Sequence, residues 1–245
     1  MIYLSGSVRA DFAGWLPHTA REFGQLAHRR RHPEYEHWSD AGDGIGFMCT
    51  PRMGNRPVPD VVWAADTGCF SDPERFDLDR YVRWLGRRDP RTCLFATAPD
   101  WPPMPQHGVP GGDWCATLDR FEETAPAIRA AGYRVALVAQ SGLECYLGQL
   151  EYWFWRGDVD AIFLGGDTRW KVSEAAADVV RSARHFGLWC HMGRCNSARR
   201  IRLAYEMGCD SADGTFLAHA GAGALGEVLR WLRPLSAQLT LPIAA

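Results

Sequence analysis

Eight short apolar runs, separated by longer amphipathic segments, constrain the fold of this chain more than any other feature. The runs span residues 2–4, 45–49, 61–65, 92–96, 135–139, 161–164, 188–191 and 209–212. Helical patterns lie between them, most clearly at 76–87, 114–131, 143–155, 173–186, 197–207 and 222–232. Alternating strands and helices indicate a parallel sheet. Eight such strands in 245 residues predict a closed (β/α)8 barrel of the TIM type.

The length and composition favour a single domain that spans residues 1–245. With 47% hydrophobic residues, the chain can bury one large core, and the proline-rich stretch 99–112 is typical of a loop rather than a linker. The N-terminus lacks the basic start and apolar run of a signal peptide, and no apolar stretch reaches the roughly 18 residues of a membrane span. We therefore expect a cytoplasmic protein.

The net charge of −2 argues against a globally basic nucleic-acid-binding protein, although a local patch can still bind nucleic acid. Of the 27 basic residues, only Lys171 is a lysine. Guanidinium groups can bind phosphate in a bidentate manner. Codon bias in a GC-rich genome would explain the excess of arginine equally well.

The eight cysteines are scattered and form no CxxC pair, which indicates reduced thiols in an intracellular protein. Cys190, His191, Cys195 and Cys209 are close in sequence and include metal-binding residue types. However, the neighbours Cys190 and His191 would point to opposite faces of a strand. We therefore predict no metal site, and we interpret His191 as a packed residue at a strand end.

Polar and glycine residues follow six of the expected strands, in the sequences ADTGCF (65–70), TAPDW (97–101), QSG (140–142), GGDTRWK (165–171), HMGRCNS (191–197) and ADGT (212–215). Active sites of (β/α)8 barrels form at the C-terminal ends of the strands, so these residues should meet at one rim. There, Asp66, Asp100 and Asp213 could accept hydrogen bonds from the N–H groups of a heterocycle. Gln140 and the glycine pair 165–166 could bind its carbonyl. Guanine presents this set of groups, and a remaining carboxylate could attack an anomeric carbon.

These motifs, in this order from about residue 61 to 215, resemble those of the tRNA-guanine transglycosylases. That family exchanges guanine for a 7-deazaguanine through a covalent aspartate intermediate. ADTGCF is similar to the family's Asp-Ser-Gly-Gly-aromatic segment. The resemblance implies that Asp66 is a general acid/base or an orienting carboxylate. It also implies that Thr67 lines the base pocket and that Phe70 stacks on the base.

The same resemblance assigns further residues to the base. Asp100 falls where the family reads the guanine N1–H and exocyclic amine. Gln140 and Gly166, with the adjacent Gly165, match positions that contact the purine carbonyl edge. Met192 and Gly193 resemble a Met-Gly pair whose thioether covers the opposite face of the base.

The segment GCDSADGT, residues 208–215, contains two aspartates three positions apart. Side chains alternate along a strand, so Asp210 and Asp213 should lie on opposite faces and serve different roles. The segment resembles the family's strand that ends in the nucleophile. The resemblance implies that Asp213 attacks the sugar and that Asp210 is structural or supports the site from behind.

The sequence also departs from the family pattern. The family's zinc site, a Cys-x-Cys-x-x-Cys with a distant His near the C-terminus, has no counterpart, because no cysteine follows Thr215. The chain resembles more closely the compact bacteriophage relatives, which are implicated in placing 7-deazaguanines such as preQ0 in DNA to protect it from restriction. The resemblance thus implies DNA as the partner, the host cytoplasm as the location and no cofactor.

Arginines that follow the seventh strand could hold phosphates around a flipped nucleotide. We predict nucleic-acid contacts by Arg194, Asn196, Arg199 and Arg200. HRRRH at 28–32 and the loop 50–57 could add contacts to the backbone.

Several alternatives stay open at the sequence level. The same base exchange could act on tRNA, or the barrel could be a non-catalytic nucleic-acid-binding subunit, and formation of a homodimer is undecided. Asp213 and Asp100 also suit turns, Asp66 a helix cap, and Gln140 a backbone partner at the barrel end. The aromatic segment 151–157 is most simply a helix packed on the sheet, although it could stack unpaired bases.

Overall fold

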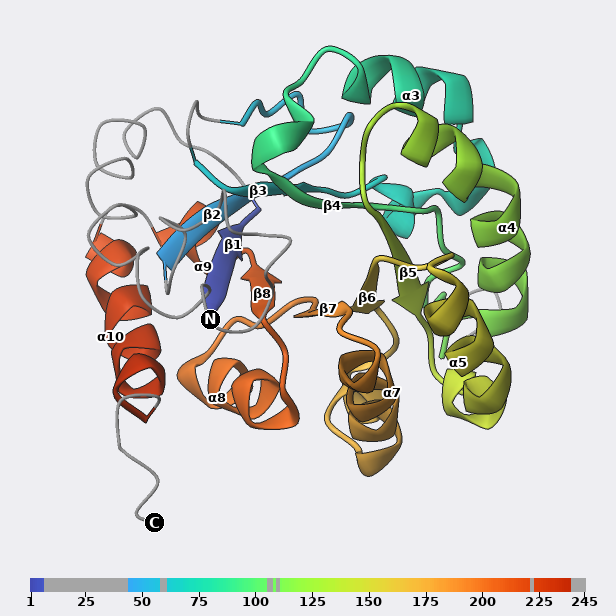
Figure 1. The fold of residues 1–245 in the computed structure, drawn as a ribbon. Helices are drawn as coiled ribbons and strands as arrows, with labels where there is room; N and C mark the ends of the chain where they lie inside the picture. The colour runs from blue at the N-terminus through green and yellow to red at the C-terminus, as the bar shows by residue number, and fades with distance from the viewer. Residues whose placement is uncertain (7–43, 58–60, 105–107, 109–110, 221–222, 239–245) are drawn as a thin grey trace.

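The eight expected strands form a closed parallel barrel. In the computed structural model, which describes residues 1–6, 44–57, 61–104, 108, 111–220 and 223–238, the strand order is β1 to β8 with β8 paired to β1. The strands are β1 (Ile2–Ser5), β2 (Gly44–Cys49), β3 (Trp63–Ala65), β4 (Cys93–Thr97), β5 (Val135–Ala139), β6 (Ala161–Leu164), β7 (Trp189–Met192) and β8 (Ser211–Gly214). The predicted (β/α)8 fold is therefore confirmed. Because every pairing is parallel, all strand C-termini meet at one end of the barrel (Figure 1).

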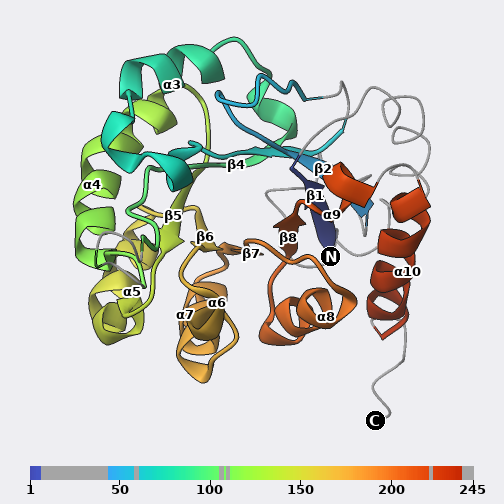
Figure 2. The same cartoon turned by 180° about the vertical axis from the view of Figure 1, so that it is seen from behind.

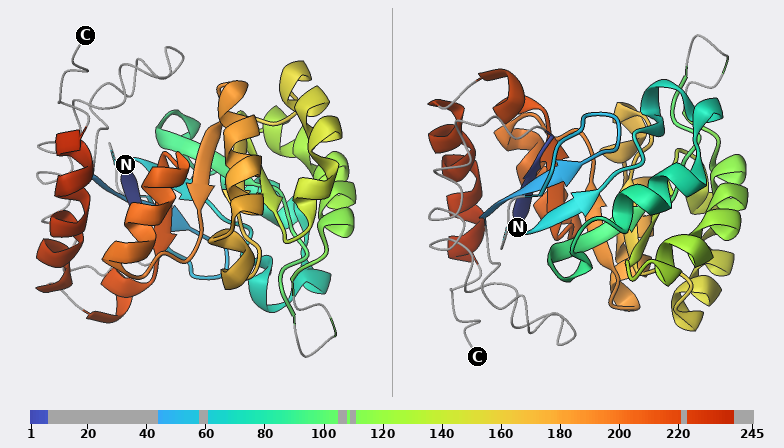
Figure 3. Two further views of the ribbon diagram at one scale, coloured as in Figure 1. Left: turned by 90° about the horizontal axis from the view of Figure 1, so that it is seen from below. Right: turned by 90° about the horizontal axis from the view of Figure 1, so that it is seen from above.

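Helices surround the strands on the outside, as Figure 2 shows from behind. They are α3 (Leu78–Leu85), α4 (Trp114–Ala130), α5 (Leu147–Arg156), α6 (Thr168–Lys171), α7 (Glu174–His185), α8 (Ala198–Met207), α9 (Phe216–Ala220) and α10 (Gly223–Gln238). Short 3-10 turns lie at Cys69–Ser71, Pro73–Arg75, Pro90–Thr92 and Leu143–Tyr146. The final helix, α10, packs against α8 and α9 (Figure 3).

Polar side chains cap the N-termini of several of these helices. Asp77, Asp113 and Ser173 each accept a hydrogen bond from a backbone N–H in the first turn of α3, α4 and α7. A side-chain acceptor at this position satisfies one of the donors that a helix start leaves unpaired. The cap of α3 is thus Asp77, which leaves Asp66 outside the helical region.

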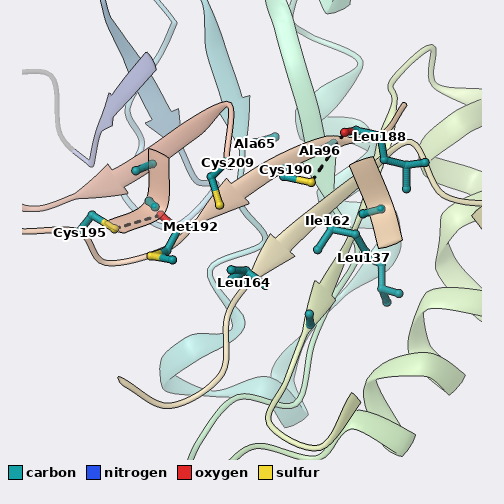
Figure 4. Close-up of a cluster of buried hydrophobic side chains, with 14 of the residues drawn as sticks. Ala65, Ala96, Leu137, Ile162, Leu164, Leu188, Cys190, Met192, Cys195 and Cys209 are labelled. Atoms are coloured by element: carbon teal, nitrogen blue, oxygen red, sulfur yellow. Dashed lines mark hydrogen bonds between the residues drawn. The ribbon is translucent and has the colours of Figure 1, made fainter. Parts of the chain in front are cut away.

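Alternation along the strands divides the apolar side chains into two layers. The inner layer fills the barrel and includes Leu4, Phe95 and Trp189, with Phe163 packed against it. The outer layer lies between strands and helices and includes Leu137, Ile162, Leu164, Cys190 and Met192, part of which Figure 4 shows. Inward and outward residues alternate along the strands, except in β4, where the neighbours Leu94 and Phe95 both belong to the inner layer.

The described residues between β2 and β3, 50–57 and 61–62, form turns and coil rather than a helix. The HRRRH segment at 28–32 lies outside the described residues. No helix in the described part of the chain is long and apolar enough to cross a membrane.

Candidate active site

A chain of polar side chains lies inside the barrel on β7 and β8. Nε1 of Trp189 donates to Oγ of Ser211 at 2.8 Å, and the same Oγ lies 2.8 Å from Nδ1 of His191. Nε2 of His191 lies 3.1 Å from Oδ1 of Asp213. An indole N–H can only donate, so the Ser211 hydroxyl hydrogen is available for Nδ1. This pattern puts the ring hydrogen on Nε2, where it points at Asp213.

The Asp213 carboxylate is held on one side only. Its Oδ1 accepts from His191 and, at 3.2 Å, from the backbone N–H of Arg194. Among the described residues, Oδ2 has no hydrogen-bond donor, and the side chain is 17% exposed. A carboxylate fixed through one oxygen, with the other free at the end of a barrel strand, is suited to nucleophilic attack.

The two aspartates of the β8 segment do lie on opposite faces. Asp210 points outward, where Oδ1 pairs with Arg184 of α7 at 3.1 Å and Oδ2 accepts from the backbone N–H of Cys190. Asp210 therefore fastens β8 to α7 and β7, while Asp213 faces the barrel interior. The shift of β8 to Ser211–Gly214, two residues beyond the predicted run, places Asp213 within the strand itself.

A second carboxylate, Asp66, follows β3. Its Oδ1 accepts from the backbone N–H of Gly68 at 3.2 Å and lies 3.5 Å from Oγ1 of Thr67. Burial raises the pKa of Asp66 above its ordinary value, and the negative charge of Asp213 raises it further. A raised pKa favours the protonated form, which is the form that a general acid needs.

The third carboxylate, Asp100, follows β4 and is coupled to Asp66. Burial raises the pKa of Asp100 to about 7, and the charge of Asp66 contributes to this increase. Nε2 of the fully buried Gln140 donates to Oδ2 of Asp100 at 2.7 Å. Gln140 therefore orients Asp100, and its Oε1 is buried without a donor among the described residues.

The backbone N–H and carbonyl groups of the glycine pair after β6 are already hydrogen-bonded within the protein. The N–H groups of Gly165 and Gly166 both donate to the carbonyl of Ala139, at 3.0 and 3.1 Å. Their carbonyls accept from Nη2 of Arg194, at 2.9 and 3.2 Å. The Gly166 N–H that the resemblance assigns to the purine carbonyl is therefore not free here.

Arg194 contacts three residues that the resemblance assigns to a base, namely Phe70, Gly165 and Gly166. Its guanidinium lies 4.7 Å from the ring centroid of Phe70, which is 55% exposed. Its positive charge also lowers the pKa of Asp100, although burial and Asp66 outweigh this effect. Arg194 has a φ of 62°, a left-handed conformation that is uncommon for a residue other than glycine.

Met192 differs from the expectation. Its side chain is 2% exposed and lies in the outer layer near Cys195 (Figure 4), on the face of β7 opposite to His191. Strand alternation is the reason, because the residue after an inward His191 must point outward. Met192 therefore cannot cover a base inside the barrel. Gly193 does border the site, since a Cβ there would lie 2.8 Å from the Phe163 ring and 3.3 Å from Oδ1 of Asp213.

The polar residues predicted to hold nucleic acid divide into two kinds. Oδ1 of Asn196 accepts from the N–H groups of Thr215 and Phe216, and Nη1 of Arg200 donates to the carbonyl of Arg194. Both of these side chains stabilise the loops beside Asp213. Arg199 is exposed and is the one of the four whose side chain has no hydrogen bond or ion pair among the described residues.

Two residues near Asp213 were missed as site residues in the sequence analysis. His191 was interpreted only as packed; it does pack at 4.6 Å from the Phe163 ring, but it also contacts Asp213. Lys171 ends α6, is 3% exposed, and donates from Nζ to the carbonyl of Gly193 at 2.7 Å. Burial lowers the pKa of Lys171 to about 8, with a further decrease from the charge of Arg194. The one signal was that Lys171 is the only lysine in the chain.

No three or more His, Cys, Asp or Glu side chains of the described segments are grouped so that they could hold a metal ion. In comparisons with known proteins, no family model matches the chain, and no curated protein matches it in sequence.

Proposed function

We propose that this protein is a guanine transglycosylase that replaces guanine in DNA with a 7-deazaguanine of the preQ0 type, through a covalent aspartyl-glycosyl intermediate. One observation carries the proposal. Asp213, whose Oδ2 has no donor among the described residues, lies at the same barrel mouth as Asp66 and Asp100, and the pKa values of Asp66 and Asp100 are raised. The order of the motifs along the chain, and their resemblance to the transglycosylases, supports the choice of reaction.

The reaction has two displacements at C1′ of the nucleotide. Oδ2 of Asp213 attacks C1′, the C1′–N9 bond breaks, and its electron pair leaves with guanine. Protonated Asp66 supplies the proton that the leaving base takes up. The 7-deazaguanine then enters and gives a proton back to Asp66, and its N9 attacks C1′ and breaks the bond to Asp213. Two displacements retain the configuration at C1′, as in retaining glycosyl transfer.

His191 and the Arg194 N–H hold Asp213 so that Oδ2 is the attacking oxygen. Asp100, oriented by Gln140, accepts from the N1–H and 2-amino groups of the base. Inside duplex DNA the base is stacked and paired, so the target nucleotide must be flipped into the barrel mouth.

The test is exchange of radiolabelled guanine into duplex DNA, with unmodified tRNA assayed in parallel and Asp213→Asn as the control. We expect label in DNA alone, and a decrease of roughly 10³-fold or more in Asp213→Asn, because removal of a nucleophile abolishes the covalent route. Label in tRNA instead of DNA would mean that tRNA is the substrate. Label in neither, with no covalent adduct on denaturing gels, would refute the enzyme and favour a binding subunit.

A further inference from the structure

A basic groove runs from the barrel mouth along the outside of the molecule, between loop 51–57 and α3. Three adjoining cavities of about 420, 170 and 720 Å³ form it, and Pro51 lines all three. The first and second share Arg80, and the second and third share Trp84 and Arg87. We call this continuous feature the arginine groove. α3 lies at the top of Figure 1.

The arginine groove begins beside the loop that follows β3, at the C-terminal end of the strands. Its first cavity is lined by Thr67, Gly68 and Cys69, which directly follow Asp66. Arg52, Arg75 and Arg80 line the same cavity. A nucleic-acid strand that leaves the barrel mouth on this side would therefore lie next to these positively charged arginines.

Arginines continue along the full length of the groove. Arg80, Arg83 and Arg87 line the second cavity. Arg80, Arg83 and Arg87 are three, four and seven positions apart, so they project from the same face along α3 and just past its end. Arg56, Arg87 and Arg88 line the third cavity, where Arg88 lies 3.7 Å above the ring of Trp84.

The positive charge of the groove is largely uncompensated. Seven arginines but only three aspartates line the three cavities. Asp72 pairs with Arg75 within the first cavity, Asp89 pairs with Arg91, and Asp77 caps α3. Arg80, Arg83 and Arg87 are exposed, and within the described residues none of them has an acidic partner. Like charges are also close together around Arg88. Burial lowers the pKa of Arg88, and the positive charges of Arg56 and Arg87 lower it further.

We propose that the arginine groove binds the sugar-phosphate backbone of the DNA strand that flanks the flipped nucleotide. The proposal rests on the function proposed above and names how the DNA lies on the protein. Arg80 and Arg83 lie on one face of α3, and Arg87 lies just past its end, so the three guanidinium groups form a row along one side of the groove. Guanidinium groups bind phosphates in a bidentate manner, and such contacts fix the position of a strand without reading its sequence.

The experiment measures binding of a fluorescein-labelled 30-base-pair DNA duplex at a series of NaCl concentrations. The groove variant carries Arg80→Gln, Arg83→Gln and Arg87→Gln, because glutamine preserves helix propensity and these side chains are exposed. The control variant carries Arg156→Gln, Arg181→Gln and Arg230→Gln, which remove the same charge from α5, α7 and α10.

Each phosphate contact contributes about 0.9 to the slope of log K against log salt, so the groove variant should lower that slope by about 2 to 3. Its affinity at 150 mM NaCl should fall at least about tenfold, while the control keeps the wild-type slope. An unchanged slope and affinity in the groove variant would overturn the proposal. So would an equal loss in the control, because the effect would then be one of net charge alone.

The two proposals fail in distinguishable ways. Asp213→Asn should bind DNA with the wild-type salt slope while base exchange is lost, which tests the chemistry without the groove. Normal base exchange and normal DNA binding in the groove variant would overturn the proposed role of the groove but not the proposed enzymatic activity. A groove-dependent loss of tRNA binding, with DNA unaffected, would overturn DNA as the occupant.

Discussion

At the scale of single residues, the site gives a pH dependence through Asp100. Only the ionised carboxylate accepts from both the N1–H and the 2-amino group of guanine, and burial raises its pKa to about 7. Guanine binding should therefore strengthen as pH rises through 7. With that pKa, the ionised fraction of Asp100 is about tenfold larger at pH 8 than at pH 6, so the affinity for guanine should be about tenfold higher at pH 8.

Equilibrium dialysis of labelled guanine against the wild type and Asp100→Asn would measure this dependence. The variant should bind weakly at every pH, with the change between pH 6 and 8 absent. A wild-type affinity that is flat over this range would contradict the assignment of Asp100 to the base.

Arg194 gives a second prediction at this scale. Its guanidinium lies against Phe70 and the carbonyls of Gly165 and Gly166, so an incoming base must displace it. Arg194→Ala should bind the free base several-fold more tightly, because the occupying side chain is gone. DNA affinity should fall in the same variant. In the wild type the displaced guanidinium can reach a phosphate, and the variant lacks this group.

Isothermal titration with a 7-deazaguanine, and gel shifts with DNA, would measure the two effects of Arg194→Ala. Arg199→Ala is the matched control, because Arg199 is exposed on α8 near the same loop. Weaker binding of the free base in Arg194→Ala would mean that the guanidinium belongs to the occupied site and is not displaced.

At the scale of elements, α6 is joined to the β7–α8 loop through the only lysine in the chain. Lys171 ends α6 and binds the carbonyl of Gly193, next to the Arg194 N–H that holds Asp213. Burial favours the neutral amine, so the pKa of Lys171 decreases to about 8. Protein labelled with ¹³Cε-lysine should give one lysine signal that titrates near pH 8.

In urea that signal should titrate near the reference value of about 10.4, because the unfolded chain exposes the amine to water. A native midpoint above 10 would contradict the burial of Lys171 beside the arginines. Lys171→Met should remove the signal and confirm its assignment. The same variant should slow base exchange, since the Gly193 carbonyl loses its donor.

The elements also show what sequence could and could not provide. Strand and helix order followed from the periodicity of apolar residues, and the opposite faces of Asp210 and Asp213 followed from the two-residue repeat of a strand. The same repeat, applied to β7, would have turned Met192 away from the site once His191 was known to face inward. The contacts of Lys171 with Gly193 and of Arg194 with Phe70 join segments 22 and 124 residues apart along the chain, and depend on loop conformations that no local pattern encodes.

At the scale of the whole molecule, the closed barrel divides the eight cysteines into two classes. All eight are free thiols, of which Cys115 and Cys145 are exposed and the others are buried. Burial raises the pKa of thiols such as Cys49 and Cys69 to about 12, which further suppresses the reactive thiolate. Native protein treated with iodoacetamide should therefore be alkylated rapidly at two positions only.

The slow positions report the stability of the barrel. Cys93 lies in β4 and Cys190 in β7, so their thiols become accessible only when the strands open. Their rates of alkylation should be nearly equal and should rise together with urea, whereas the rates at Cys115 and Cys145 should hardly change. Peptide mass spectrometry over time would measure all of them in one sample, and the double variant Cys115→Ser, Cys145→Ser should lose the fast phase. Alkylation of Cys93 or Cys190 at the rate of Cys145 in native buffer would mean that the barrel is not closed in solution.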